Sequence, residues 1–257
     1  MTVTIRFYEE LNFFLKKELR KEQIEGQAAP GQTVKDLIES FGVPHVEVDL
    51  VLVNGTAVDF SYQVQPGDKI SVYPVFERFD ISDLSHLRPE PLRNPCFIAD
   101  VHLGTLARRL RNLGFYTEYH NHAGDAYLAE RAANQGLILL TRDRQLLMRK
   151  IVQRGMYVKN TEPFEQVREV VARLDLYEKM KPFSRCAACN GVLHELRPAS
   201  PEWEEAQPQI PPGVRAWCTE YRRCENCGKV YWKGSHLKQL DRLLAQLEQD
   251  RQANQAT

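Results

Sequence analysis

Three aspartates stand where the sequence changes from an apolar or loop segment to a helical pattern. Asp100 follows the apolar run 96–99, Asp143 follows the run 137–140, and Asp125 opens another helical pattern. If these carboxylates converge, a cation must offset their repulsion, and a set of oxygen ligands suits Mg²⁺ or Mn²⁺. Such an ion can activate a water and stabilise the charge that develops on a phosphodiester. The pattern therefore predicts a metal site for hydrolysis, although Asp is also a favoured helix N-cap and each position could be only that.

Four cysteines form two C-x-x-C pairs, Cys186 with Cys189 and Cys224 with Cys227. Two such pairs separated by a long insert are typical of a tetrahedral zinc site in a zinc ribbon. A redox-active pair is disfavoured because neither pair opens a helix after a strand. The ribbon is too small to fold well on its apolar core alone, so we expect the Zn²⁺ to be structural. Cysteines used as metal ligands also indicate a reducing compartment, which for this chain we take to be the cytoplasm.

The aspartates lie in a segment that alternates short apolar runs with helical patterns. In residues 103–113 the apolar positions recur at helical spacing, and the continuous run 137–140 is typical of a parallel strand covered on both faces. Alternating strands and helices predict right-handed crossovers and a parallel sheet, whose strand carboxyl ends meet at one crevice. Asp100 and Asp143 would lie at such ends, with Asp125 in a loop on the same side.

Basic residues lie on the helix after the first aspartate and on both sides of the third. They would suit contact with phosphates beside the metal site, but a solvated helix face would explain them as well. Tyr231, Trp232 and His236, which follow the second cysteine pair, could stack on bases, form part of an active-site wall or pack against the ribbon. We predict nucleic-acid contacts from four side chains: Arg109, Arg142, Arg144 and His236.

The N-terminal part of the chain has a pattern of its own. Residues 1–80 give the order strand, helix, hairpin, strand, with Thr33 as the helix cap and Asn54-Gly55 as the hairpin turn. Residues 12–20 could be strand or loop. Residues 81–94 are rich in proline and polar side chains and predict a linker.

Toward the C-terminus, three segments are expected to be exposed. Residues 198–212, rich in proline and glutamate, predict a mobile loop. On the predicted helix 163–174, the side chains of Arg168, Glu169 and Arg173 are expected to form a solvated face. Residues 248–257 are expected to be disordered.

Three of the central segments resemble the Mut7-C branch of the PIN-like ribonucleases: FIADVHLGTLARRLRNLG, GDAYLAERA and LLTRDRQL. The resemblance implies a metal-dependent ribonuclease site, which falls on Asp100, Asp125 and Asp143. Many PIN domains carry a fourth acidic residue, for which the nearest candidates here are Glu118 and Glu130. The stretch YWKGSH also ends the zinc ribbon in the manner of this family.

The N-terminal segments VLVNGTAV and VQPGDKISVYPV resemble the β-grasp of ubiquitin-like sulfur carriers such as ThiS and MoaD. Those carriers end in Gly-Gly, whose carboxylate is activated, whereas here residues 74–80 contain no diglycine and the chain continues. The resemblance therefore implies a binding or scaffolding role rather than sulfur transfer. A ubiquitin-like domain in tandem with Mut7-C also fits the Mut7-C family.

Composition limits the function classes. The chain of 257 residues has 34 basic and 34 acidic side chains, so RNA binding would depend on local patches. No apolar run approaches the roughly 20 residues of a membrane helix, and we expect no membrane association. The first residues lead directly into a strand pattern rather than a signal peptide, which agrees with a cytoplasmic location.

We therefore predict an α/β protein with an N-terminal ubiquitin-like β-grasp domain (1–80), a linker (81–94), a central PIN-like parallel-sheet nuclease domain (95–180) and a zinc ribbon with a C-terminal helix (181–257). The favoured function is metal-dependent hydrolysis of RNA phosphodiesters. The alternative is a non-catalytic RNA-binding module that kept the fold and lost a full acidic set. RNA is the expected partner, and the β-grasp domain could bind a protein.

Overall fold

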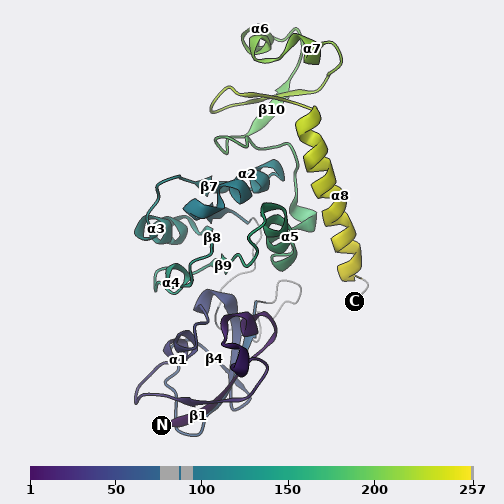
Figure 1. The fold of residues 1–257 in the computed structure, drawn as a ribbon. Coiled ribbons are helices and arrows are strands. Elements are labelled where there is room, and N and C mark those ends of the chain that lie inside the picture. Colours follow the sequence, from purple (N-terminus) through teal and green to yellow (C-terminus); the bar gives the residue numbers. More distant parts are fainter. Residues whose placement is uncertain (76–86, 88–94, 256–257) are drawn as a thin grey trace. The chain divides into compact units, whose positions relative to one another are not determined.

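The computed structural model describes residues 1–75, 87 and 95–255, without the side chains of residues 235–238 and 254–255. The predicted linker lies outside the described residues, apart from Leu87. The chain forms two compact units, one from Met1–Asn94 with Ala123–Tyr157 and the other from Pro95–His122 with Val158–Thr257. Figure 1 labels their helices and strands.

The first unit contains a five-stranded sheet with the order β2-β1-β5-β3-β4. Its central strands β1 and β5 run parallel, and the other neighbours are antiparallel. Buried Leu37 and Ile38 of the helix α1 (Val34–Ser40) share one core with Ile5 and Val72 of the central strands. This arrangement confirms the predicted β-grasp. The strands are β1 (Thr2–Phe7), β2 (Ile24–Gln27), β3 (Val48–Val53), β4 (Thr56–Val58) and β5 (Lys69–Pro74).

Local signals in this sheet act as the sequence predicts. The Thr33 hydroxyl accepts a hydrogen bond from Asp36 N at 3.2 Å and caps α1. Asn54 and Gly55 have φ values of 51° and 85°, which the type I′ turn of the β3–β4 hairpin requires. Residues 12–20, in contrast, are neither strand nor extended loop. Residues 12–14 and 17–19 lie in two 3₁₀ helices, η1 (Glu9–Phe14) and η2 (Lys17–Leu19), and residues 15, 16 and 20 are irregular.

The rest of the first unit alternates helices and strands. β8 pairs in parallel with β9, with Leu140 opposite Met156. All four residues of β8 are buried, as the continuous apolar run predicts. The elements are the short helix η3 (His45–Glu47) and then α3 (Asp125–Gln135), β8 (Ile138–Thr141), α4 (Arg144–Leu147) and β9 (Gly155–Tyr157).

The second unit contains a parallel pair of the same kind. β6 pairs in parallel with β7, with Ile98 opposite Glu118. Parallel strands connected by helices therefore occur in both units, and the predicted α/β class is confirmed. The elements are β6 (Phe97–Ala99), η4 (Val101–Leu103), α2 (Gly104–Asn112), β7 (Thr117–Tyr119), α5 (Pro163–Arg173) and η5 (Tyr177–Lys179).

The ribbon, also in the second unit, is an antiparallel sheet with the order β10-β11-β12. Its insert was predicted to be a mobile loop, and this prediction is wrong. The insert forms short helices, and buried Ala206 and Ile210 pack in one core with Tyr221. The elements are β10 (Leu193–Leu196), α6 (Pro201–Ala206), η6 (Gln207–Gln209), α7 (Pro212–Arg215), β11 (Tyr221–Cys224) and β12 (Val230–Trp232).

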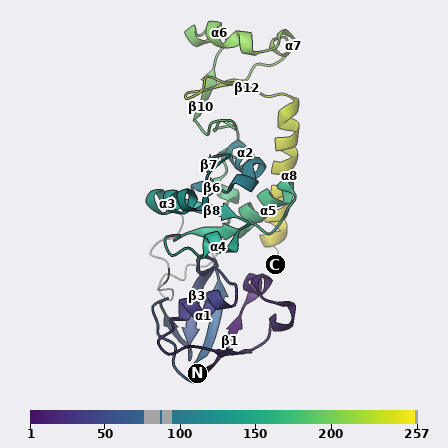
Figure 2. The ribbon, with the colours of Figure 1, turned by 60° about the vertical axis from the view of Figure 1, so that its left-hand side comes forward.

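The last helix, α8 (Ser235–Gln255), runs beside α5 in both ribbon views (Figures 1 and 2). Arg168 of α5 donates two hydrogen bonds to Asp250 of α8, at 2.7 and 2.8 Å. The carboxylate of Glu169 is buried and accepts from Lys159 N and Asn160 N, each at 2.9 Å. The prediction of a solvated face on α5 is therefore wrong, because these charges bind each other and the backbone. The prediction of disorder in residues 248–257 is wrong for residues 248–255, which are helical, and residues 256–257 lie outside the described residues.

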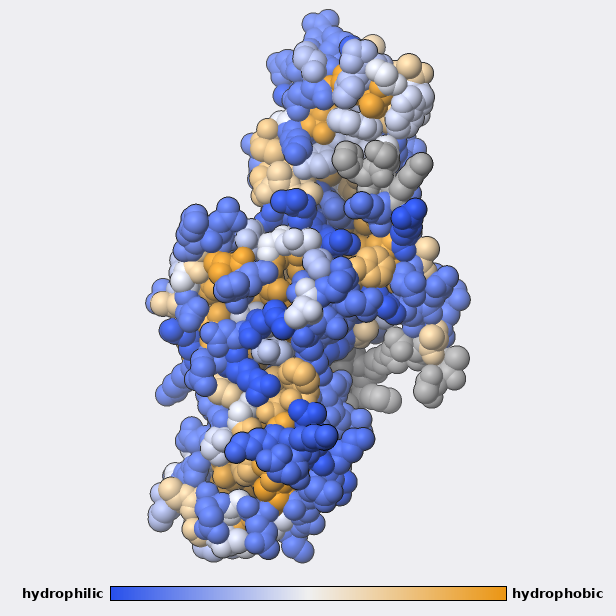
Figure 3. Space-filling view, viewed as in Figure 1, coloured by the Kyte–Doolittle hydropathy of each residue, from blue (hydrophilic) through white to orange (hydrophobic). Residues whose placement is uncertain are grey.

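The surface is largely polar on the face shown in Figure 3, where apolar residues gather only in small groups. Large exposed apolar side chains are scattered along the described chain, such as Tyr127, Ile151 and Trp217. Single exposed side chains of this kind are normal for globular proteins. No helix among the described residues is both long and apolar enough to cross a membrane.

Candidate functional site

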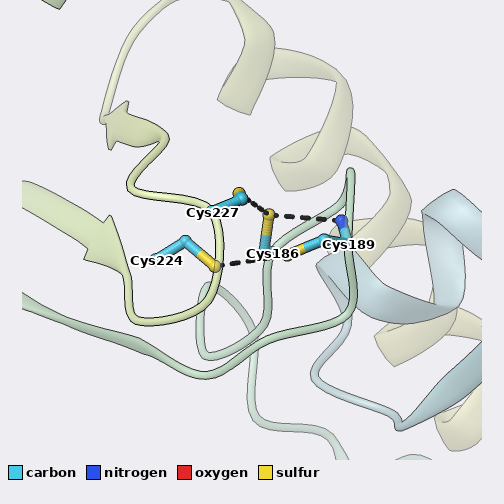
Figure 4. A group of neighbouring side chains, drawn as sticks. All are labelled: Cys186, Cys189, Cys224 and Cys227. Carbon is cyan, nitrogen blue, oxygen red and sulfur yellow. Dashed lines mark hydrogen bonds between the residues drawn. The ribbon is translucent and has the colours of Figure 1, made fainter.

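The two cysteine pairs meet beside the ribbon sheet (Figure 4). The sulfurs of Cys186 and Cys227 lie 3.7 Å apart, and those of Cys189 and Cys224 lie 3.4 Å apart. All four sulfurs lie within 4.8 Å of one another. A tetrahedral site with Zn–S bonds of about 2.3 Å places its sulfurs about 3.8 Å apart. The predicted cysteine cluster is therefore present, and its geometry fits a tetrahedral metal ion.

Each C-x-x-C pair lies in a tight turn, called a knuckle: the first holds Cys186 and Cys189, and the second holds Cys224 and Cys227. Local backbone geometry explains why the sequence folds into these two knuckles. The first closes with a hydrogen bond from Asn190 N to Cys186 O at 2.9 Å, and the second with one from Gly228 N to Cys224 O at 3.0 Å. Asn190 has a φ of 69°, a left-handed conformation that Asn tolerates better than most residues. A Cβ on Gly191 would lie 2.8 Å from Cys224 Sγ. Gly191 is thus required for the sulfurs to pack together, and asparagine is favoured at position 190.

Tyr231 distinguishes Cys186 from the other three thiols. Its hydroxyl lies 3.0 Å from Cys186 Sγ. Burial acts to raise the pKa of Cys186, but hydrogen bonds from Tyr231 and from the backbone N–H groups of Cys189 and Ala188 outweigh burial and lower the pKa to about 7. Burial raises the pKa of the other thiols, Cys189, Cys224 and Cys227. Cys186 is therefore the thiol that ionises most readily, and a metal ligand must be ionised.

Arg111 bonds the first knuckle to the helix and strand that follow Asp100. Its side chain is only 7% exposed. Nε donates to Thr117 O of β7 at 2.9 Å, and Nη1 donates to Ala187 O at 3.2 Å and Ala188 O at 2.9 Å. Thr117 N in turn donates to the Asn190 side-chain oxygen at 3.0 Å. The turn between the first two cysteines is thus held by α2 and β7.

Sequence reasoning missed this role of Arg111, because it grouped the residue with the other arginines of α2 as solvated or phosphate-binding. The distinguishing signal is its phase along the helix. Arg111 follows buried Ala107 by four residues and lies on the buried stripe, whereas Arg108 is exposed.

Asp100 and Asp143 lie at strand carboxyl ends, as the sequence predicts. Asp100 follows β6, is buried, and accepts a hydrogen bond from His102 N at 3.3 Å; the Nδ1 atom of His102 is also 3.3 Å from Asp100 Oδ1. Asp143 follows β8 after one residue and caps α4. Its Oδ1 accepts from Gln145 N at 2.7 Å and from Leu146 N at 3.4 Å.

Asp125 is the first residue of α3, and Gly124 is the N-cap. The Asp125 side chain is 53% exposed, and Oδ2 lies 4.0 Å from Arg149 Nη2. Asp100 belongs to the second compact unit, whereas Asp125 and Asp143 belong to the first. Each unit defines the local geometry of its own aspartates, and the three-aspartate cluster remains a prediction.

The two candidates for a fourth acid have different surroundings. Glu118 is buried on β7, and its Oε1 accepts a hydrogen bond from the Tyr116 hydroxyl at 2.6 Å. Glu130 is exposed on α3. Neither assignment as a ligand is tested by these contacts.

Arg144, one of the predicted RNA-binding residues, contacts the backbone and three aromatic rings. Its Nη1 donates to Phe14 O at 3.0 Å. Its guanidinium carbon lies 5.7, 5.1 and 5.7 Å from the ring centres of Phe13, Phe14 and Tyr157. These cation–π contacts join the residue after Asp143 to the β-grasp domain within the first unit.

Two further contacts join the β-grasp domain to the same segment. Glu47, which is buried, accepts a hydrogen bond from Tyr157 N at 2.6 Å. His45 lies with Nδ1 2.7 Å from Glu39 Oε1 and Nε2 2.9 Å from Val152 O. The β-grasp domain therefore helps to hold the segment that carries Asp143, which no sequence pattern indicated.

Three further side chains were predicted to contact RNA: Arg109, Arg142 and His236. The guanidinium carbon of Arg109 lies 6.0 Å from the ring centre of Phe164, so this side chain packs α2 against α5. Arg142 is partly buried. The side chain of His236 lies outside the described residues. Contact of these residues with RNA stays a prediction.

Two models of known protein families match the chain. Residues 95–244 match the model of the Mut7-C RNAse domain, and residues 1–80 match that of the Mut7-C ubiquitin domain. No curated protein and no solved structure matches the chain.

The chain thus combines a ubiquitin-like β-grasp with a ribonuclease-type domain that carries a four-cysteine cluster. It belongs to the Mut7-C RNAse domain family and has the Mut7-C ubiquitin domain at its N-terminal side. The resemblance seen in the sequence is confirmed.

Proposed function

We propose that the protein is a metal-dependent ribonuclease that hydrolyses RNA phosphodiesters. Asp100, Asp125 and Asp143 would hold Mg²⁺ or Mn²⁺, and the cysteine cluster would hold a structural Zn²⁺. Support comes from the match to a ribonuclease domain model over residues 95–244. It also comes from the aspartates, two of which stand at the carboxyl ends of parallel strands, where ligands bind in sheets of this type.

The observation that carries the proposal is how Asp143 uses its two oxygens. Oδ1 accepts both capping hydrogen bonds from α4, and Oδ2 makes no hydrogen bond or ion pair with the described residues. A cap and a metal ligand are therefore not exclusive roles for this residue. The cap fixes the carboxylate in one orientation, and the second oxygen is left for a cation.

The other residues of the chain would orient the site and attract the substrate. The backbone N–H of His102 donates a hydrogen bond to the carboxylate of Asp100. Because this side chain is ordered before any ion binds, ion binding loses less conformational entropy. Arg149 is close enough to Asp125 to reduce repulsion among the carboxylates and to meet an RNA phosphate. When bound, the divalent ion supplies activation of a water and stabilisation of charge on the phosphate.

The four sulfurs suit Zn²⁺ better than they suit Mg²⁺ or Mn²⁺, because thiolates are soft ligands. Their separations of 3.4 and 3.7 Å agree with a tetrahedral ion. Since all four positions are protein ligands, such a zinc would have no open position for substrate and would be structural.

The test is the substitution Asp143→Asn. The new side chain keeps the capping oxygen and replaces only the second oxygen, so the stability of the metal-free protein should be unchanged or slightly higher as repulsion falls. Hydrolysis of a single-stranded RNA in Mn²⁺ should fall by about 10²-fold or more, given what a positioned ion contributes.

Glu162→Gln is a matched control. Glu162 caps α5 with Oε2, which accepts from Phe164 N at 2.7 Å and Glu165 N at 3.0 Å, and it is exposed. This variant should hydrolyse RNA like the parent. If Asp143→Asn also cleaves RNA at the parent rate, the site assignment is wrong. If the parent binds RNA and cleaves none with either ion, the alternative of a non-catalytic RNA-binding module replaces the proposal.

A further inference from the structure

A cavity of about 410 Å³ lies within the second unit, between α2 and the ribbon. Cavities that hold organic ligands measure roughly 300–1,000 Å³, so this one could take a group the size of a nucleobase with its sugar. Six of its lining residues are cationic or aromatic: Arg108, Arg185, Lys229, Phe183, Tyr231 and Trp232. None of the three aspartates is among the residues that line the cavity.

The charges around the cavity are of one sign. Among the described residues, three cationic side chains line it and no acidic residue does. The chain as a whole has no net charge, so this is a local concentration of positive charge. Arg108 and Lys229 are exposed, and the Lys229 ammonium lies 5.8 Å from the Tyr231 ring centre. Arg185 donates to Asn190 O at 2.9 Å, and its guanidinium carbon lies 5.1 Å from the Tyr116 ring centre.

The aromatic residues are partly buried and held in place. Phe183 N donates to Asn112 O at 3.1 Å, and the guanidinium carbon of Arg222 lies 5.6 Å from the Phe183 ring centre. The Tyr231 hydroxyl is hydrogen-bonded to Cys186 Sγ, and Trp232 packs against the core of the ribbon. Rings that are already fixed lose little conformational entropy when a flat group stacks on them.

We propose that this cavity binds an unpaired segment of the RNA substrate, with a base stacked on the aromatic residues and the adjoining phosphates held by Arg108 and Lys229. Single-stranded nucleic acids are bound by aromatic platforms beside positive grooves, and the bases of a duplex are not available for such stacking. The inference deepens the proposed function and rests on it for the identity of the ligand as RNA. It also gives Tyr231 and Trp232 a stacking role, one of the alternatives that the sequence left open.

The probe is a short fluorescein-labelled single-stranded oligoadenylate, with the same sequence annealed to its complement as the duplex comparison. Fluorescence anisotropy without added Mg²⁺ or Mn²⁺ gives Kd in the absence of hydrolysis. The parent should bind the single strand more tightly than the duplex. Single-stranded DNA of the same sequence should bind almost as well, because stacking and phosphate contacts do not recognise the 2′-hydroxyl.

Two variants test the two kinds of contact. Trp232→Ala should weaken binding by about tenfold through loss of stacking. Arg108→Ala, an exposed position where misfolding is not expected, should lower the slope of log Kd against log salt by about 0.7 through loss of one phosphate contact. Arg215→Ala is the matched control, since Arg215 is exposed on α7 and does not line the cavity, and its Kd and salt slope should match the parent's.

The outcomes separate this inference from the proposed function. If Arg108→Ala and Arg215→Ala have the same Kd and salt slope, or if the duplex binds as tightly as the single strand, the cavity is not the RNA site, even if Asp143→Asn abolishes hydrolysis. If the cavity variants weaken binding while no RNA is hydrolysed with either ion, the cavity assignment stands and the proposed nuclease activity falls.

Discussion

Arg111→Met should both destabilise the second unit and weaken metal binding at the cysteine cluster. Methionine keeps much of the buried aliphatic volume and removes the guanidinium. Three hydrogen bonds are lost, to Thr117 O at 2.9 Å, Ala187 O at 3.2 Å and Ala188 O at 2.9 Å. The substitution therefore removes the bonds that join β7 and the first knuckle to α2.

The magnitude follows from these three bonds and from burial. Hydrogen bonds to a charged donor contribute about 1.5–3 kcal/mol each, but burial of the guanidinium opposes part of that sum and already lowers the pKa of Arg111. Because the three bonds share one donor group and are not additive, we expect a net loss of about 3–5 kcal/mol. That is a large fraction of the about 5–15 kcal/mol by which domains are stable.

Metal binding should change as well. Charges on Cys186 and Cys189 favour the cationic form of Arg111, and this interaction is reciprocal, so the guanidinium favours the thiolates that bind a metal ion. Loss of groups that hold metal ligands from outside typically reduces metal affinity by about 10–100-fold. Arg111→Lys keeps the charge without the planar fork and should fall between the parent and Arg111→Met in both measurements.

The assay has two readouts on the zinc-loaded chain. Urea unfolding gives the change in stability, and competition with a chromophoric chelator gives zinc affinity and stoichiometry. The parent should bind one zinc per chain and Cys224→Ser none. Arg108→Met, on the exposed side of the same helix, should change stability by no more than about 0.5 kcal/mol. If Arg111→Met matches Arg108→Met in both stability and zinc affinity, the coupling of α2 to the knuckle is refuted.

Two further predictions concern contacts that sequence patterns did not reveal. Arg144→Lys should destabilise the first unit by about 1–2 kcal/mol, because an ammonium group cannot stack on three rings and bond Phe14 O together; an unchanged melting temperature would contradict this. The hydrogen bond from Arg168 lowers the pKa of Asp250, so the pair stabilises the fold above the unfolded-state Asp pKa of about 3.9 and this contribution is lost as pH falls through the lower folded pKa. Asp250→Asn should therefore be less stable than the parent at neutral pH, and the difference should vanish in acid; a difference that stays constant with pH would exclude the mechanism.

Sequence spacing was sufficient where neighbours in the chain determine the structure. The C-x-x-C pairs predicted the cluster because each knuckle closes within its own few residues, as the bond from Asn190 N to Cys186 O shows. The cap at Thr33 and the Asn54-Gly55 turn were predicted for the same reason. The position of Asp143 at the start of a helix also follows from local pattern.

The sequence failed where a charged side chain has a partner far along the chain. Arg144 bonds Phe14, which is 130 residues away, and Arg111 bonds Ala188, which is 77 residues away. An arginine on a helix is usually interpreted as exposed to solvent or as binding phosphate. Its position relative to the buried face of the helix must be considered as well. In the ribbon insert, Pro201 and Pro212 were taken as loop signals, although proline is favoured in the first turn of a helix, where both stand.

These long-range bonds bear on how a structural zinc could support hydrolysis without touching substrate. The bonds of Arg111 and the bond from Thr117 N to Asn190 make the first knuckle part of the packing of α2 and β7. Two backbone hydrogen bonds also join the end of α2 to the segment before the ribbon. They run from Lys181 N to Leu113 O at 2.8 Å and from Phe183 N to Asn112 O at 3.1 Å.

An ion that binds the folded knuckle and not the unfolded chain stabilises every element that must be folded with it. Those elements include α2, which η4 connects directly to Asp100. Removal of zinc should therefore raise the hydrogen exchange of α2 and β7 backbone amides as well as that of the ribbon, because their order depends on the same bonds. Exchange that rises only in residues 184–232 would show instead that the knuckle opens without them, and that Asp100 is held independently of the metal.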